Sequence, residues 1–324
     1  MPTPRRRRTG SRFVPTLALA ASACLAAVPL ASAQSTAQAD GTITVGSLGS
    51  TADLPASASG SLGSLAQPAY ADYVALGDSY AAFGDQTETL GPASCDRSTT
   101  NYASTLDANP AVGDLTDVSC GGARIPDLAA GQAPGIPAQF DALDVGTDLV
   151  TLSIGGNDVG FSMIVGCITR QGPFAQLPPT STCQSQIGGN VELAINAVFG
   201  TGGQIDDVYD AIEERSPQAK VIATRYLPLM PAAGGSCAFT DSLNPDDVAW
   251  ARAVGAAINV AVNIAATRNG HVSVLPTSVD DRSACAPADQ RWTDFLGGPP
   301  TNAAPFHPTA LGQQAMAGAI ADAL

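Results

Sequence analysis

Short apolar segments that alternate with helical patterns constrain the fold of this chain more than any other feature. The segments are Tyr73–Leu76, Leu149–Ile154, Val221–Thr224, Val272–Leu275 and, more weakly, Leu115–Ser119. Apolar strands separated by helices are typical of a parallel sheet with crossover helices. The sequence therefore predicts an α/β fold with a central, mostly parallel sheet of roughly five strands.

Two helices near the C-terminus have recognisable starts. Asn244 can cap a helix that Pro245 begins, and its body runs from Val248 to Arg268. A final helix is predicted over Thr309–Leu324, directly after His307-Pro308. We expect no membrane-spanning segment in this part of the chain, because no later stretch of 18 apolar residues lacks charges.

The N-terminus is typical of a secretory signal. Arg5–Arg8 form a cationic start, Phe13–Leu30 are apolar, and Ala31–Ala33 form a small-residue cleavage site. A signal peptide is thus predicted over residues 1–33, and a Ser/Ala/Gly-rich leader over residues 34–68. The remaining residues, 69–324, have the length of one α/β domain. We expect the mature protein to be secreted and extracellular.

The cysteines agree with an oxidising compartment. Cys24 lies in the signal, which leaves six: Cys95, Cys120, Cys167, Cys183, Cys237 and Cys285. An even number in an exported chain indicates three disulfides, although six cysteines allow 15 connectivities. The chain has no Cys-x-x-Cys pair, so a zinc site is not expected.

Charge excludes several classes of partner. The chain has 15 basic residues against 29 acidic ones, and Arg5–Arg8 and Arg12 account for five of the basic residues. Such a balance disfavours nucleic acid, which needs a basic face. Lys220 is the only lysine, and it does not stand in the Gly-Lys-Ser/Thr context of a phosphate-binding loop. We expect the protein to be a monomer.

Ser79 is the candidate nucleophile. It follows the first predicted strand, Gly77 and Asp78, at the carboxyl end of the sheet, where ligands bind in open parallel sheets. An ordinary helix-capping serine would occupy the same position, so the tripeptide alone decides nothing. A serine nucleophile needs a base, and the chain has only two histidines. His271 starts a strand at the opposite end and is expected on the surface, which leaves His307.

An ester carbonyl under attack also needs hydrogen-bond donors for its oxyanion. Gly122 can bring its N–H close because it has no Cβ. Asn157 follows two glycines at the end of another strand and can present its side-chain amide. A plain Gly/Asn turn is the alternative for this second segment. With the N–H of Ser79, these groups make three candidate donors.

Four segments of the chain, taken in order, resemble the four blocks of the SGNH (GDSL) hydrolases. They are Gly77-Asp78-Ser79-Tyr80, Gly122, Gly155-Gly156-Asn157-Asp158 and His307-Pro308-Thr309. The resemblance extends from about Tyr73 to the C-terminus and includes the secreted actinobacterial lipases and esterases of that family. It implies a flavodoxin-like three-layer α/β/α sandwich that uses neither a metal nor an organic cofactor. It also implies that Ser79 is the nucleophile, that His307 is the base, and that Ser79, Gly122 and Asn157 form the oxyanion hole. Sequential pairing of the six cysteines is part of the same resemblance.

One position departs from the family pattern. Many members carry aspartate three residues before the histidine, where it orients the imidazole. Here that residue is Ala304. We expect a Ser79–His307 dyad in which the backbone carbonyl of Ala304 accepts the Nδ1–H. The alternatives are four aspartates brought in by folding: Asp280, Asp281, Asp289 and Asp294.

The expected substrate is a neutral, apolar ester. A long loop over Val159–Gly189 carries many apolar side chains and forms either an acyl-chain wall or a cluster that only covers the sheet edge. The segment Leu227–Pro231 adds a second apolar wall. The resulting hypothesis is a lipase or esterase that cleaves lipid esters through an acyl-enzyme. Alternatives are a carbohydrate O-acetyl esterase, a phospholipase or acyltransferase, and, from another class, a non-catalytic binding module.

Overall fold

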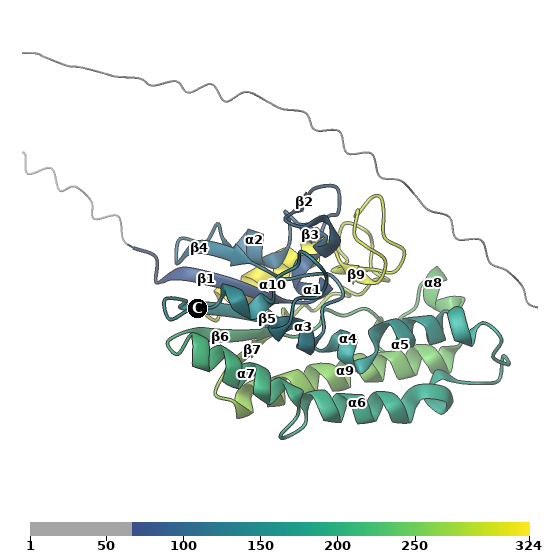
Figure 1. The fold of residues 1–324 in the computed structure, drawn as a ribbon. Helices are drawn as coiled ribbons and strands as arrows, with labels where there is room; N and C mark the ends of the chain where they lie inside the picture. The colour runs from purple at the N-terminus through teal and green to yellow at the C-terminus, as the bar shows by residue number, and fades with distance from the viewer. Residues whose placement is uncertain (1–66) are drawn as a thin grey trace, which may run out of the picture. The chain divides into compact units, whose positions relative to one another are not determined.

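The computed structural model describes residues 67–324, so the predicted signal peptide (1–33) and all but the end of the predicted leader (34–68) lie outside the described residues. The centre of this part is a five-stranded sheet in the order β4-β1-β5-β6-β7, with every neighbouring pair parallel (Figure 1). The strands are β1 (Tyr70–Gly77), β4 (Val112–Asp117), β5 (Leu149–Ser153), β6 (Lys220–Thr224) and β7 (Val272–Val274). All five predicted strands are confirmed within a few residues of their expected ends.

Side chains alternate between the two faces of the sheet and so divide the core in two. In β1, Val74 and Leu76 pack on one face, whereas Tyr73 and Ala75 pack on the other. The first face is covered by α3 (Ile125–Ala129), α6 (Gly189–Phe199), α7 (Gln204–Arg215) and α9 (Pro245–Arg268). The second is covered by α1 (Ser79–Ala82), α2 (Tyr102–Leu106) and α10 (Ala310–Ala321). The predicted three-layer α/β/α sandwich is therefore confirmed.

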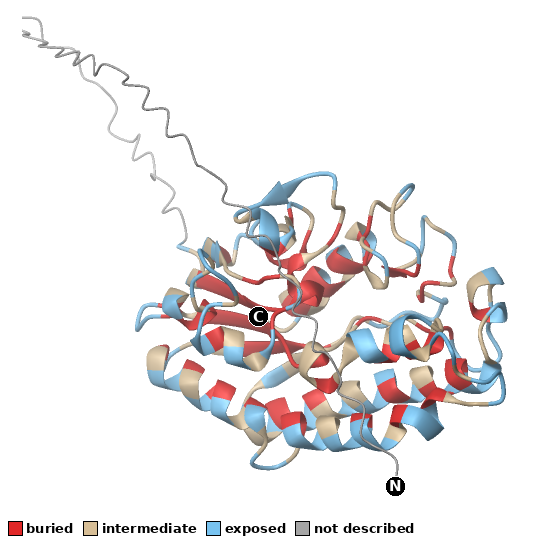
Figure 2. Cartoon of the chain, turned by 45° about the vertical axis from the view of Figure 1, so that its right-hand side comes forward, coloured by how far each residue is buried: buried red, intermediate tan, exposed pale blue. Residues whose placement is uncertain are grey.

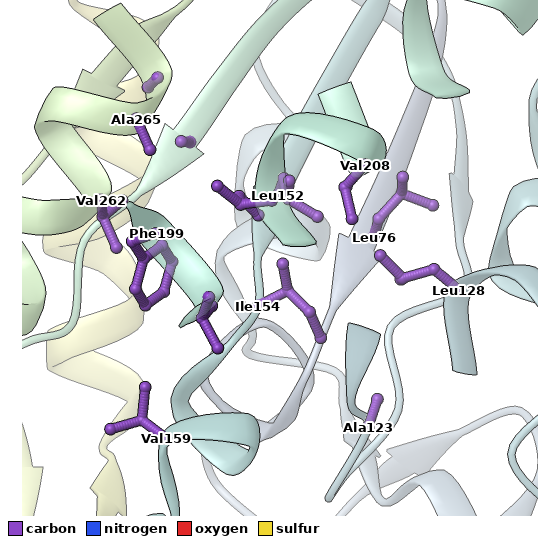
Figure 3. Close-up of a cluster of buried hydrophobic side chains, with 14 of the residues drawn as sticks. Leu76, Ala123, Leu128, Leu152, Ile154, Val159, Phe199, Val208, Val262 and Ala265 are labelled. Carbon is purple, nitrogen blue, oxygen red and sulfur yellow. The ribbon is translucent and has the colours of Figure 1, made fainter. Parts of the chain in front are cut away.

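The buried strands lie between outer helices on which buried and exposed residues alternate (Figure 2). Figure 3 shows part of the core on the first face of the sheet, where Leu76 and Leu152 of the strands lie near Leu128 and Val208 of the covering helices. Apolar side chains that leave water on both faces of a sheet supply the main stabilisation of such a fold.

Helix α9 begins at Pro245, with the Asn244 side chain accepting the N–H of Asp246 at 2.9 Å, as the sequence indicates. By length and composition alone, it is the one helix of the described residues that could cross a membrane. In the structure its buried side chains, among them Val248 and Val262, belong to the core.

The prediction of one long loop over Val159–Gly189 was wrong. This segment contains the end of α4 (Gly156–Val159), helix α5 (Phe161–Ile168), a 3-10 turn (Gly172–Phe174) and a π-helical turn (Gln184–Gly188) that leads into α6. The signal was present, because Phe161, Ile164 and Ile168 are spaced as on one face of a helix. A salt bridge of 2.9 Å between Arg170 and buried Asp247 fixes the irregular part to α9.

Three disulfides join Cys95 to Cys120, Cys167 to Cys183 and Cys237 to Cys285. The sequential pairing that the family resemblance implies is thus confirmed. The remaining short elements are α8 (Ala238–Asp241), the 3-10 turns Ala93–Cys95 and Gln139–Ala142, the pair β2 (Thr89–Leu90) and β3 (Arg97–Ser98), and the pair β8 (Thr293–Asp294) and β9 (His307–Pro308). The last pair is antiparallel and sets Asp294 opposite His307.

Candidate active site

Ser79 is the first residue of α1, directly beyond the carboxyl end of β1. The turn is tight: Gly77 has φ +142°, and a Cβ there would overlap the backbone of Ser153 in β5. Asp78 caps the helix, because its Oδ1 accepts the N–H of Tyr80 at 2.9 Å. Its own N–H donates to the carbonyl of Ser153 at 2.7 Å. The hydroxyl of Ser79 is therefore held at the edge of the sheet by fixed backbone contacts.

His307 lies against this hydroxyl although 228 positions separate the two residues. Its Nε2 is 2.8 Å from the Ser79 Oγ. The imidazole is surrounded by aromatic rings, with centroids 4.8 Å away for Phe83 and 5.7 Å away for both Tyr80 and Phe161. Burial among them lowers the pKa of His307, so the ring is neutral at neutral pH. A neutral imidazole at this distance can accept the hydroxyl proton.

The second ring nitrogen corrects the prediction for Ala304. The Nδ1 of His307 lies 2.7 Å from the carbonyl oxygen of Pro305, and the Ala304 carbonyl instead accepts the backbone N–H of His307 at 3.2 Å. The cause is Phe306, which has φ +65° and turns the chain between Pro305 and the histidine. A bond from the Phe306 N–H to the Asp294 carbonyl and one from the Tyr80 hydroxyl to the Phe306 carbonyl fix this turn.

None of the four alternative aspartates hydrogen-bonds to the imidazole within residues 67–324. Asp294 lies opposite His307 in the β8–β9 pair. Its Oδ1 accepts the N–H groups of Leu296 and Gly297, and its Oδ2 accepts the hydroxyl of Thr301 at 2.6 Å. Asp281 accepts the N–H of Ser283, and Asp280 faces Arg282. Asp294 therefore shapes the loop before the histidine, while a backbone carbonyl orients the ring.

The two remaining predicted donors lie in neighbouring turns. Asn157 stands in the first turn of α4, and its Nδ2 donates to the Ala123 carbonyl at 2.9 Å. Gly122, with φ +76°, lies between Ala123 and Cys120, whose N–H donates to the Gly77 carbonyl at 3.0 Å. In the described part of the chain, the N–H groups of Ser79 and Gly122 donate no hydrogen bond. Neither N–H group is thus committed to another acceptor among these residues.

Tyr226, which the sequence did not single out, connects two of these turns. Its hydroxyl accepts the N–H of Gly156 at 2.7 Å and donates to Oδ2 of Asp78 at 2.8 Å. Burial raises the pKa of Asp78 to about 7, partly offset by the bonds from Tyr80 and Tyr226. Tyr226 thus links the turn that carries Ser79 to the turn that carries Asn157. No local pattern could have indicated it, because 148 positions separate it from Asp78.

A cavity of about 290 Å³ opens beside Ser79 and Asn157. One wall is helix α5, with Phe161, Ile164 and Ile168, and a second is the segment from Leu227 to Met230. Helix α9 forms the third side. The volume is at the lower end of the usual range for small-ligand sites. Among the described residues, no group of three or more His, Cys, Asp or Glu side chains could hold a metal ion.

Comparison with known proteins agrees with this geometry. The sequence matches the GDSL-like Lipase/Acylhydrolase family over residues 75–315. It is 38% identical to Lipase 2 of Streptomyces coelicolor over 260 residues, and this alignment covers 78% of this chain and 85% of that protein. It is 32% identical to a lipase of Streptomyces rimosus over 244 residues, and this alignment covers 75% of this chain and 82% of that protein.

Solved structures show the same arrangement of elements. The crystal structure of the extracellular lipase from Streptomyces rimosus superposes with a TM-score of 0.64 at 30% identity, covering 78% of this chain and all of that one. Phospholipase A1 from Streptomyces albidoflavus shares the fold, with a TM-score of 0.58 at 23% identity and coverage of 78% and 99%. With Ser79 and His307 in contact at the sheet edge, these matches establish that the chain belongs to the GDSL-like lipase/acylhydrolase family of hydrolases.

Proposed function

We propose that this protein is a secreted carboxylic-ester hydrolase that cleaves acyl esters of lipids through an acyl-enzyme intermediate on Ser79. The observation that carries the proposal is the 2.8 Å contact between Ser79 Oγ and His307 Nε2 at one end of an apolar cavity. A hydroxyl bonded to a neutral imidazole is an activated nucleophile. The lipases that resemble this chain support the reaction class.

In the first half of the reaction, His307 takes the Ser79 proton at Nε2 while Oγ attacks the ester carbonyl carbon. The carbonyl oxygen gains the negative charge and is stabilised by the N–H groups of Ser79 and Gly122 and by the second Nδ2 hydrogen of Asn157. The tetrahedral intermediate then collapses, the ester C–O bond breaks, and His307 returns its proton to the leaving alcohol. The acyl group remains on Ser79.

In the second half, His307 removes a proton from water, the resulting hydroxide attacks the acyl carbon, and the carboxylic acid leaves as Ser79 recovers its proton. The imidazolium that forms in each half is stabilised through Nδ1 by the carbonyl of Pro305, 2.7 Å away. The carbonyl dipole orients the ring and stabilises its positive charge, as a carboxylate does in a triad, but with a partial instead of a full negative charge.

The walls of the cavity favour an apolar acyl group. Most of its lining side chains are aliphatic or aromatic, and Arg252, its only lining cation, is turned to the Pro231 carbonyl. Burial of methylene groups contributes roughly 0.8 kcal/mol each, which favours a medium or long chain over acetate. Secretion is supported by the predicted signal peptide and by the three disulfides.

Fluorophosphonate labelling combined with an ester panel tests the proposal. The oxidised wild-type protein should be labelled covalently and should hydrolyse p-nitrophenyl esters, with medium to long acyl groups preferred over acetate. Ser79→Ala should abolish both labelling and hydrolysis, while Ser153→Ala, a matched change in the neighbouring strand, should leave Ser79 reactive. Absence of labelling in folded wild-type protein would point to a binding module, and a preference for acetate alone would contradict the lipid substrate.

A further inference from the structure

We propose that Gly255, in the middle of α9, sets the length of acyl chain that the cavity accepts. This inference rests on the proposed ester hydrolysis at Ser79. Arg252, Gly255 and Asn259 all line the cavity. Residues spaced by three and four positions lie on one face of a helix, so Gly255 is at the centre of the face that α9 turns to the cavity.

The contacts of α9 give this face a direction. Asn259 exchanges hydrogen bonds with the backbone of Tyr226, which in turn contacts Asp78 beside the nucleophile. Two helical turns before Asn259, the Arg252 side chain donates a hydrogen bond to the Pro231 carbonyl. At a rise of 1.5 Å per residue, residues 259 and 252 are about 10 Å apart along the axis. The cavity therefore extends along α9 from the catalytic end at Asn259, and Gly255 lies midway.

No local requirement for glycine exists at this position. Glycine is unfavourable inside a helix, and the backbone here is ordinary right-handed helix within Pro245–Arg268. A Cβ on Gly255 would meet no heavy atom within 4 Å, whereas a Cβ on Gly312 in α10 would overlap the carbonyl of Trp292. The missing side chain leaves open space on the wall of the cavity rather than room for a neighbouring element.

A larger side chain at this position would shorten the cavity. Helical side chains lean back over the preceding turn, so a leucine at position 255 would cover Ala251 and Arg252, which both line the cavity. The first carbons of an acyl chain, next to Asn259, would still have room. The carbons beyond the middle of α9 would not.

The test compares two glycine substitutions in helix interiors. The ratio of kcat/KM for p-nitrophenyl laurate to that for p-nitrophenyl butyrate should fall about tenfold or more in Gly255→Leu, since a single methylene in an apolar pocket changes specificity roughly 10–200-fold. Gly255→Ala should give a smaller fall in the same direction. Gly318→Leu is the matched control, because its Cβ also meets nothing within 4 Å but position 318 does not line the cavity. Its ratio should equal that of the wild type.

A ratio in Gly255→Leu within twofold of the wild type would overturn the inference, as would an equal loss on both esters. Failure of Gly255→Leu to fold would also overturn it, because the space around position 255 would then not be open. These results differ from failure of the proposed function, in which the wild type itself would hydrolyse neither ester.

Discussion

The two histidines of the chain lie at opposite ends of the sheet and differ in what their rings contact. His307 lies at the carboxyl end beside Ser79, whereas His271 directly precedes β7 at the amino end. We expected His271 on the surface, and this was wrong, because its side chain is only 8% exposed and packs on Tyr209 of α7 at 4.7 Å. Burial lowers the pKa of both histidines.

Since both rings are covered, burial does not distinguish a general base from an ordinary histidine. The hydrogen bonds do. Both nitrogens of His307 are engaged, one with a hydroxyl and the other with the Pro305 carbonyl that orients it. The Nε2 of His271 has no hydrogen-bond partner among the described residues and lies 3.6 Å from Glu213. Of the two rings, His307 is therefore the one whose hydrogen bonds suit the proposed general base.

Removing each histidine in turn gives the largest expected effect. His307→Ala should lower kcat for p-nitrophenyl butyrate by about 10⁴-fold or more, because Ser79 loses the group that takes its proton. His271→Ala should leave kcat within about twofold. Steady-state kinetics on both folded variants measure the difference, and comparable losses would show that the two ends of the sheet do not differ as we describe.

Asn157→Ala should have the next largest effect. The substitution removes one predicted oxyanion donor while the Ser79–His307 contact stays in place, so kcat should fall roughly 10²–10³-fold with little change in KM. Labelling of Ser79 by a fluorophosphonate should slow but persist. Asn269→Ala, near the His271 end of the sheet, is the control, and a loss in kcat as small as that of this control would remove Asn157 from the proposed oxyanion hole.

A smaller effect is expected from the hydroxyl of Tyr226. Tyr226→Phe leaves the Gly156 N–H and the Asp78 carboxylate without their shared partner, at a cost to stability of about 1–3 kcal/mol. The turns that carry Ser79 and Asn157 should then be less well fixed, and kcat should fall about tenfold. Tyr209→Phe, beside His271, should not change kcat. A lower Tm with unchanged kcat in Tyr226→Phe would limit the hydroxyl to a structural role.

The pH dependence gives the smallest but most specific test. Because burial lowers the pKa of His307 below its ordinary value of 6.5, the neutral base should persist to lower pH. The kcat/KM of the wild type should therefore rise with pH and level off with a midpoint below 6.5, and His271→Ala should not move that midpoint. A midpoint near 7 would instead assign the rise in kcat/KM to Asp78 and contradict the assignment to His307.

The sequence predicts most accurately those features that are local in the chain. The strands β1 and β5, which lead to Ser79 and Asn157, are apolar runs. Gly77 follows from the close approach of its backbone to that of β5, and at Gly155 a Cβ would overlap the ring of Phe199. The order of the family's blocks identifies Ser79 and His307 without coordinates. Such features depend on a few adjacent residues, so their pattern survives in the sequence.

The features that the sequence does not predict depend on contacts distant in the chain. The choice of Pro305 over Ala304 as acceptor follows from the left-handed conformation of Phe306, which contacts from Asp294 and Tyr80 fix. Left-handed backbone is uncommon outside glycine, and nothing near Phe306 signals it. The role of Tyr226 is equally hidden, because three separate strand ends must meet before its hydroxyl has partners.

The position of His307 after all five strands of the sheet also orders the events of biosynthesis. A nascent polypeptide that has emerged only as far as β7 already contains Ser79, Gly122 and Asn157, but it lacks His307. On the proposed mechanism, hydrolytic competence comes only with the β8–β9 pair, which carries His307, and with α10, whose Gln313 donates to the Tyr80 carbonyl beside Ser79. If Ser79 and His307 act together as proposed, synthesis from the amino end leaves the growing chain inert until the segment that carries His307 has docked.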